Sequence, residues 1–193
     1  KNKWYERYVK FISFDKQKYI DLLFDMKKFE KKINFKISNK QNFIEYSEIG
    51  LKYLKDITKI IKKNTGGLLL IDYGYTEKKM KNTLQAISNH KFANILENIG
   101  NSDITHNISF NLFKNFVKKI GDLSNNLTTQ KEFLTQMKIE QRAEIISKNL
   151  SFSKKADIYL RLNRLINEKQ MGNSFKVMLI KNKNNKFNLG FKN

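Results

Sequence analysis

The residues best suited to chemistry lie between positions 66 and 110. Four apolar residues, Leu68 to Ile71, are followed directly by the polar segment Asp72 to Tyr75. Such a run is typical of a central strand in a parallel sheet covered by helices on each side. Side chains at the carboxyl end of that strand lie where open α/β sheets bind ligands. Asp72 therefore either holds a ligand or caps the turn that follows it.

Two further residue types near this strand end could take part in a site. Tyr73 and Tyr75 either face a pocket or pack against neighbouring elements. His90 and His106 lie in the polar stretch that follows. There a histidine can act as a general base, although exposed loop histidines commonly have no role. Both interpretations stay open for each residue.

Several motifs that define known classes of site are absent from the chain. It has no glycine-rich phosphate loop, no His-x-x-x-His and no Gly-x-Ser-x-Gly. With no cysteine, disulfide scaffolds and thiolate zinc sites are excluded, and two histidines do not favour a metal site. Asp103 and Thr105 could serve a ligand or simply form a turn. Residue types alone therefore indicate an α/β domain with a loop-lined site.

The charge of the chain suggests a polyanion as partner. It has 38 basic and 18 acidic residues, a formal net charge of +20. The lysines are scattered, however, and only four basic residues are arginine, the side chain most used for specific phosphate and base recognition. Abundant Lys, Asn and Ile without any Pro indicates a coding bias. An RNA-binding or RNA-modifying domain remains the alternative.

Length and composition indicate a folded domain. The chain has 193 residues, 40% of them hydrophobic, which is enough to bury a core. No apolar run approaches the roughly 18 residues of a membrane span. The composition suits an AT-rich bacterial genome, and hence the cytoplasm, with the mitochondrion as the alternative location.

The elements around this segment follow from periodicity and capping signals. Residues 3–14 form a strand, and residues 19–38 a hairpin or a short helix. Ser47 caps a helix that ends near residue 63, and Gly66 and Gly67 lead into the apolar strand. A long polar loop then reaches Ser109, which caps a helix over residues 110–120.

The rest of the chain is predicted to be mainly helical. A short strand near residues 123–127 precedes a capping box at Thr129, which opens a helix through Leu150. A second helix covers residues 157–167. Residues 175–180 form a last strand that pairs antiparallel at an edge of the sheet. The tail, residues 181–193, is predicted to be frayed and solvated.

The order of motifs from Trp4 to Val177 resembles the carboxyl-terminal half of the MidA family. These are class I S-adenosylmethionine-dependent methyltransferases, and they include the arginine methyltransferase of mitochondrial complex I assembly. Asn107 and Ser109 depart from the family pattern, which has histidine and aspartate there, although Ser109 can still cap a helix. The matching pieces are WYERYV, IEYSEIGLKYLKDI, GGLLLIDYGY, NTLQA, HKF, DIT, SF, FLTQMKIEQRAEII and MGNSFKVMLI.

The resemblance implies a fold and a division of the chain. The fold is α/β, a partial Rossmann-like class I methyltransferase sheet with helices on both faces and the amino-terminal cofactor-binding half missing. The family holds S-adenosylmethionine with an acidic-x-Gly-x-Gly loop, an acidic residue and an Asn-Glu-Phe-Phe-Asp segment, none of which occurs in residues 1–65. No cofactor-binding residue is therefore assigned. The chain becomes the carboxyl-terminal part of one domain, with segments 1–65, 66–127, 128–180 and 181–193.

The resemblance also implies a reaction. The intact protein would transfer methyl from S-adenosylmethionine to a protein arginine in respiratory complex I assembly, and this chain alone would be inactive. Asp72 is implied as the catalytic residue that holds the guanidinium. The implied substrate-binding residues are Tyr73, Tyr75, His90, Asp103 and Thr105. Besides an RNA-binding domain, the alternative is a non-catalytic assembly factor that has kept the fold.

Overall fold

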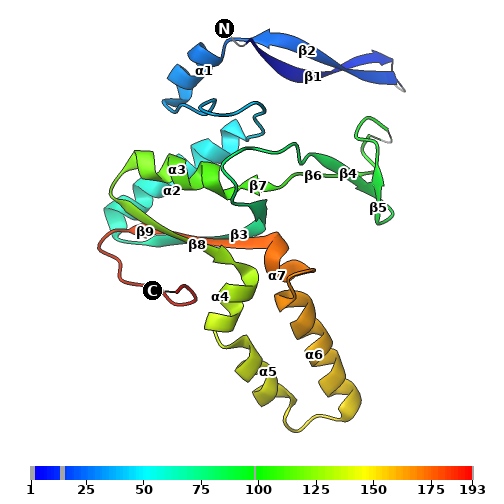
Figure 1. The fold of residues 1–193 in the computed structure, drawn as a ribbon, viewed down its shortest axis with the longest axis vertical. Coiled ribbons are helices and arrows are strands. Elements are labelled where there is room, and N and C mark those ends of the chain that lie inside the picture. Colours follow the sequence, from blue (N-terminus) through cyan, green and yellow to red (C-terminus); the bar gives the residue numbers. More distant parts are fainter. Residues whose placement is uncertain (1–2, 14–15, 98, 193) are drawn as a thin grey trace. The chain divides into compact units, whose positions relative to one another are not determined.

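The computed structural model describes residues 3–13, 16–97 and 99–192 of the chain (Figure 1). They divide into two compact units. The hairpin unit combines Lys1–Glu45 with Lys79–His106, and the sheet unit combines Tyr46–Lys78 with Asn107–Asn193. Within the described ranges, no helix has the length and apolar character needed to cross a membrane.

The hairpin unit begins with a two-stranded ribbon and a short helix. Strand β1, Trp4–Ser13, pairs antiparallel with β2, Lys16–Phe24, and helix α1 spans Met26–Ile33. This confirms the first predicted strand, whose last residue, Phe14, lies outside the described residues. Residues 19–38 were predicted to form either a hairpin or a short helix. They contribute to both, since β2 completes the hairpin and α1 follows it.

A small antiparallel sheet completes the hairpin unit and corrects the predicted long loop. Strands β4, Gln85–Ser88, β5, Lys91–Ala93, and β6, Asp103–Thr105, are arranged in the order β5-β4-β6. Asn89 and His90, at φ of 48° and 60°, form the two-residue turn between β4 and β5. A left-handed conformation at both turn positions matches the twist of a tight hairpin. The sequence signal was weak because histidine replaces the usual glycine.

The sheet unit is built on a four-stranded mixed sheet in the order β7-β3-β9-β8. Its strands are β3, Gly67–Tyr75, β7, Ile108–Ser109, β8, Leu123–Thr129, and β9, Phe175–Asn182. β3 pairs antiparallel with β9 over seven residues and parallel with β7 over only two. β3 is an inner strand as predicted, but the predicted parallel pairing occurs only with β7, and its longer ladder, with β9, is antiparallel. Antiparallel pairing of the last strand is confirmed, but β9 lies inside the sheet rather than at its edge.

Two capped helices cover one face of this sheet (Figure 1). Helix α2, Glu48–Asn64, and helix α3, Phe110–Ile120, begin at the predicted caps Ser47 and Ser109, whose side chains accept backbone N–H groups. On this face Met178 and Ile180 of β9 are fully buried. The predicted boundaries of both helices are confirmed. They could be predicted because a capping residue and the N–H group that it accepts lie within three residues of each other in the sequence.

The opposite face is covered by helix α4, Gln130–Gln136, and by the chain's last residues. Phe133 of α4 packs with Val177, Leu179 and Phe191, and the Phe133 and Phe191 ring centroids are 5.4 Å apart. The predicted frayed, solvated tail is therefore wrong where Lys181, Asn182, Gly190 and Phe191 are buried, whereas Phe187 and Leu189 are exposed. Its apolar side chains bury part of the sheet, and the Lys181 ammonium donates to the Phe187 carbonyl oxygen. Helices on both faces are as predicted.

Three further helices lie between α4 and β9. They are α5, Ile139–Ser147, α6, Phe152–Ile166, and α7, Met171–Ser174. The single helix predicted through Leu150 is interrupted at Lys138, which adopts a left-handed conformation with φ of 63°. A left-handed residue cannot continue a right-handed helix. The predicted helix over residues 157–167 corresponds to α6.

Candidate functional site

The segment Asp72–Tyr75 occupies the carboxyl end of β3, where the sequence placed it. Asp72 is exposed, and its Oδ1 accepts the backbone N–H of Tyr73 at 2.8 Å. Its neighbour across the ladder is Lys176 of β9, whose ammonium donates to the Asn173 carbonyl oxygen. The carboxylate thus accepts the N–H of the next residue within β3, and not one of a turn after the strand. Its exposure also leaves it accessible to a ligand.

The two tyrosines that flank Gly74 have different surroundings. Tyr73 is 51% exposed and lies against Phe175, with ring centroids 3.9 Å apart. Tyr75 is buried at 7% exposure. Packing therefore accounts for Tyr75, whereas Tyr73 is half exposed and, as the next residue of β3, points to the opposite face of the sheet from Asp72.

Gly74 is the position where the backbone approaches its neighbours most closely in this segment. A Cβ atom built there would lie 2.4 Å from the Ile108 carbonyl oxygen and 2.6 Å from the Phe110 ring. Phe110, the first residue of α3, is fully buried. Glycine is therefore required here so that α3 can begin beside the strand end.

The other predicted site residues belong to the hairpin unit. His90 is the exposed second residue of the β4–β5 turn. Asp103 and Thr105 are exposed residues of β6, and the Gln85 amide donates to the Thr105 hydroxyl at 3.1 Å. The structure therefore divides the predicted residues into two groups. One group lies on β3 and the other on the small sheet of the hairpin unit.

Electrostatic pairs in the described residues stabilise elements away from the β3 end. The Arg7 guanidinium donates two hydrogen bonds of 2.8 Å to the Asp21 carboxylate, which lowers the pKa of that carboxyl. The Thr128 hydroxyl, with Lys192 as a further partner, lowers the pKa of Glu132 at the start of α4. Both shifts arise from hydrogen bonds that favour the ionised carboxylate.

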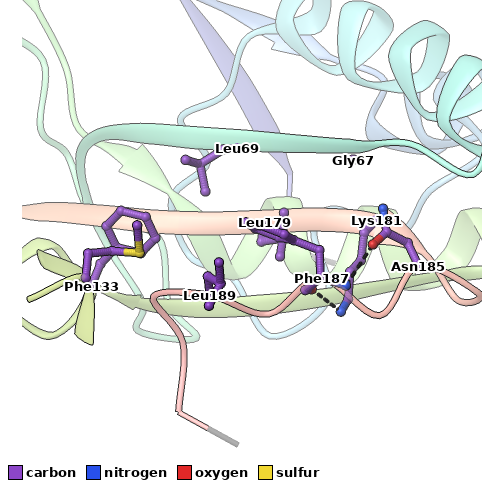
Figure 2. Close-up of a pocket in the computed structure, with 9 residues that line it drawn as sticks. Gly67, Leu69, Phe133, Leu179, Lys181, Asn185, Phe187 and Leu189 are labelled. Atoms are coloured by element: carbon purple, nitrogen blue, oxygen red, sulfur yellow. Dashed lines mark hydrogen bonds between the residues drawn. The ribbon is translucent and has the colours of Figure 1, made fainter.

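A pocket of about 480 Å³ lies on the face of the sheet opposite α2 and α3 (Figure 2). Leu69 lies on one side of it and the tail residues Phe187 and Leu189 on the other (Figure 2). It lies toward the amino end of β3, whereas Asp72 is near the carboxyl end. The sequence does not predict this pocket, because a solvated tail would not line it. The alternation of Phe187, Leu189 and Phe191 was the available signal. The full lining is Gly67, Leu69, Phe133, Met137, Leu179, Lys181, Asn185, Phe187 and Leu189.

Comparison with known proteins identifies the family. Residues 1–129 match the family model described as "Putative S-adenosyl-L-methionine-dependent methyltransferase". The chain belongs to this family. The match covers most of the chain and confirms the resemblance to MidA-type proteins drawn from the motifs.

Curated relatives of the family share part of this sequence. The mitochondrial protein arginine methyltransferase NDUFAF7 of Xenopus tropicalis is 29% identical over 126 residues, which is 64% of this chain and 28% of that protein. Its homologue in Caenorhabditis elegans is 34% identical over 90 residues, 45% of this chain and 21% of that protein. The match therefore spans only about a fifth to little more than a quarter of the length of these curated relatives.

Solved structures confirm the fold class. An uncharacterized protein from Burkholderia thailandensis matches 97% of this chain with a TM-score of 0.76 and 20% identity, and the match covers 51% of that protein. A protein of the same superfamily and organism, bound to S-adenosyl-homocysteine, matches with a TM-score of 0.73 and 19% identity. The α/β, class I methyltransferase-like fold that the sequence predicted is thus the observed one.

The carboxyl end of β3 does not supply a cradle for S-adenosylmethionine. Such a cradle needs glycines that leave the backbone open to the cofactor. At the carboxyl end of β3 the only glycine is Gly74, and the space beside it is filled by Ile108 and Phe110. Gly66 and Gly67 lie at the amino end of the strand instead. We therefore derive no step through the cofactor from these residues.

Proposed function

We propose that the intact protein transfers a methyl group from S-adenosylmethionine to a nitrogen of a protein arginine. The family match over residues 1–129 carries this proposal. The names of the curated relatives, which are protein arginine methyltransferases, supply the acceptor. Because the carboxyl end of β3 supplies no cofactor cradle, we propose that this chain contributes the acceptor side. Residues 1–193 alone would then be inactive.

Asp72 is the residue that we propose to hold the acceptor. A guanidinium is planar and always charged, and a carboxylate binds it with two parallel hydrogen bonds. The exposed position of Asp72 at the strand end permits such an approach. Tyr73, the next residue of β3, points to the opposite face of the sheet, so its ring would contact a different part of the substrate protein. Holding the acceptor in line with the methyl group accounts for a large part of the rate of such a transfer.

The remaining candidates keep their proposed roles on weaker structural support. Tyr75 is buried, so its contribution would be to fix the strand end and α3 rather than to touch the substrate. His90, Asp103 and Thr105 belong to the hairpin unit, and their exposure supports a role in binding the substrate protein. No residue of the chain is proposed to hold a metal ion.

The partner and the location are also proposals. The relatives' names place those proteins in mitochondria. This corresponds to the alternative location that the composition left open, whereas the bacterial cytoplasm stays a prediction. We propose an assembly substrate of respiratory complex I as the methyl acceptor, because the motif order resembles the family member with that role.

The test separates binding of the acceptor from capping of the backbone. Asp72→Ala removes the charge and the hydrogen bond to Tyr73 N–H, whereas Asp72→Asn removes only the charge, because an amide oxygen also accepts that N–H. In the product of the whole coding frame, both variants should lower the transfer of labelled methyl to protein arginine by about tenfold or more. Melting temperature provides the control for folding.

Two outcomes would contradict the proposal. If Asp72→Asn retained full activity, the carboxylate would serve only as a cap, and Asp72 would have no role toward the acceptor. If labelled methyl appeared in RNA and not in protein, the acceptor would be a nucleic acid, as the charge of the chain allows. Recovery of methylarginine by amino-acid analysis distinguishes these results.

A further inference from the structure

The pocket on the sheet face opposite α2 and α3 has apolar walls and one charged end. Figure 2 shows Phe133 at one end, Lys181 and Asn185 at the other, and leucine side chains between them. Its volume of about 480 Å³ is in the range of pockets that hold small organic ligands. Such pockets combine apolar walls with a few polar groups that orient the ligand. The pocket therefore has the size and the composition of a small-molecule site.

Lys181 brings a buried positive charge to this pocket. The residue is 9% exposed, and its ammonium donates to the Phe187 carbonyl oxygen. Within the ranges that the structure describes, no carboxylate pairs with this ammonium, and the lining contains no acidic residue. By contrast, the more exposed Lys131 pairs with Glu168 at 2.7 Å. Because buried charges in proteins are normally paired, the pocket holds an ammonium that lacks its counter-charge.

The other polar side chain of the pocket is already engaged at both ends of its amide. Asn185 Nδ2 donates to the Thr65 carbonyl oxygen at 3.1 Å, and Asn185 Oδ1 accepts the Phe187 N–H at 2.8 Å. These bonds fix the turn of the tail and, with it, the carbonyl that receives the Lys181 ammonium. An ammonium has three donors and no acceptor. A polar group that enters the pocket therefore meets the remaining donors of Lys181 and has to be an acceptor.

The walls of the pocket include apolar side chains that remain exposed to solvent. Leu69 of β3, Met137 at the end of α4 and Phe187 of the tail are 43%, 47% and 51% exposed. Gly190 holds the tail close to α4, since its φ is 84° and a Cβ built there would lie 2.3 Å from the Phe133 ring. An apolar body in the pocket would remove these side chains from water, which favours binding.

We propose that this pocket binds a small amphipathic carboxylate, with its anionic group on Lys181 and its apolar body extending toward Phe133. The carboxylate would accept a charge-assisted hydrogen bond and supply the missing counter-charge. A cationic ligand would be repelled by the ammonium, and an uncharged apolar ligand would leave the ammonium unpaired. Every lining residue belongs to the sheet unit, so that unit forms the pocket by itself.

This site is separate from the residue proposed to hold the methyl acceptor. Leu69 and Asp72 are three residues apart on β3, so their side chains lie on opposite faces of the sheet. The pocket also lies toward the amino end of the strand, beside Gly67. Binding of the carboxylate therefore does not require the proposed methyl transfer.

Calorimetric titration of the product of the whole coding frame with decanoate tests the charge, and decanol is the uncharged control ligand. Lys181→Met removes the ammonium but keeps an unbranched side chain, whereas Lys183→Met removes an equal charge from an exposed position outside the pocket. Decanoate should bind at one site per chain and more tightly than decanol. Lys181→Met should weaken decanoate by about tenfold or more and leave decanol unchanged. Lys183→Met should change neither.

Three results would overturn the proposal. Equal weakening in the two lysine variants would assign the binding to the overall positive charge of the chain. Equal affinity for decanoate and decanol in the unchanged protein would remove the role of Lys181. Absence of decanoate binding to the whole product would show that no small carboxylate enters the pocket, including the case in which another part of the polypeptide fills it.

A pair of glycine variants tests where the ligand lies. A Cβ built at Gly67 would lie 3.4 Å from the Ile180 carbonyl oxygen and 3.5 Å from the Lys181 Cβ, both ordinary contact distances. Gly67→Leu should therefore fold and fill the charged end of the pocket, which should weaken decanoate by about tenfold or more. No atom lies within 4 Å of a Cβ built at Gly66, so Gly66→Leu should bind as the unchanged protein does.

Melting temperature shows whether each variant folds. Unchanged decanoate binding by a folded Gly67→Leu variant would overturn the placement of the ligand in this pocket. None of these measurements depends on methyl transfer. An inactive product that binds decanoate through Lys181 would refute only the proposed function, and an active product that does not bind it would refute only this inference.

Discussion

Replacing Gly74 by alanine should strain the strand end on which the proposed site depends. The added Cβ would lie 2.4 Å from the Ile108 carbonyl oxygen, about 1 Å short of the 3.4 Å at which ordinary contact begins. Neither neighbour can move freely. Ile108 is held in the β3–β7 ladder opposite Gly74, and Phe110 is fully buried at the start of α3.

The magnitude follows from this geometry. Overpacking a filled site costs about 1–3 kcal/mol. Because the added Cβ would clash with both the Ile108 carbonyl oxygen and the Phe110 ring, we expect a cost at the upper end, about 3 kcal/mol. In a domain of this size, 1 kcal/mol corresponds to a shift of roughly 2–4 °C in melting temperature, so the expected loss is roughly 6–12 °C. Calorimetry or far-UV circular dichroism of the purified chain measures it.

Gly66→Ala is the matched control at the other end of the same strand. No atom lies within 4 Å of a Cβ built at Gly66, and no left-handed φ is required there. This change should be neutral, or stabilising by about 0.4–1 kcal/mol, through the loss of unfolded-state freedom. If Gly74→Ala melted at the same temperature as Gly66→Ala, the close approach of α3 to β3 would be refuted.

Two further changes test the C-terminal tail and its contacts. Phe191→Ala should destabilise the sheet unit by about 3 kcal/mol, the lower end of the cost of removing a buried phenylalanine ring, because that ring is 7% exposed and packs against Phe133. Phe187→Ala, which changes a ring that is 51% exposed, should cost under about 1 kcal/mol, and equal urea midpoints would contradict the packing. The pKa of Glu132 is lowered from its ordinary value of 4.5, so its contribution to stability is complete above pH 4.5 and is lost as pH falls through the lower, folded-state pKa. In Glu132→Gln, the urea midpoint should fall less steeply as pH drops below 4.5 than it does in the unchanged chain. The same pH dependence of the midpoint in both proteins would contradict this role of Glu132.

Local signals made the caps and the principal elements predictable from the sequence. Each of the three N-caps accepts a backbone N–H group three residues further along the chain, so both partners can be read from one short stretch of sequence. These caps are Ser47, Ser109 and Thr129. The apolar strand β3 and the last strand β9 were predicted for the same reason, since each is a continuous run. The partner of each strand was not predictable, because pairing joins residues that are far apart in the chain.

The small sheet β4 to β6 and the ordered tail were not predicted, and both omissions have the same physical cause. Strands β4 to β6 have three or four residues each, so neighbouring strands rather than local propensity hold them in place. The tail is ordered by Phe191, whose partners lie on β9 and α4. For the candidate site, the position of Asp72 at a strand end was predictable. The separation of Tyr73 from His90 into different units depended on tertiary structure.

Methyl transfer by the product of the whole coding frame tests the proposed function most directly. With labelled S-adenosylmethionine and a protein acceptor, that product should place label on arginine, whereas residues 1–193 alone should transfer none. A folded whole product that neither binds S-adenosylmethionine nor labels any acceptor would contradict the assignment. The chain would then belong to a member of the family that keeps the fold without the chemistry.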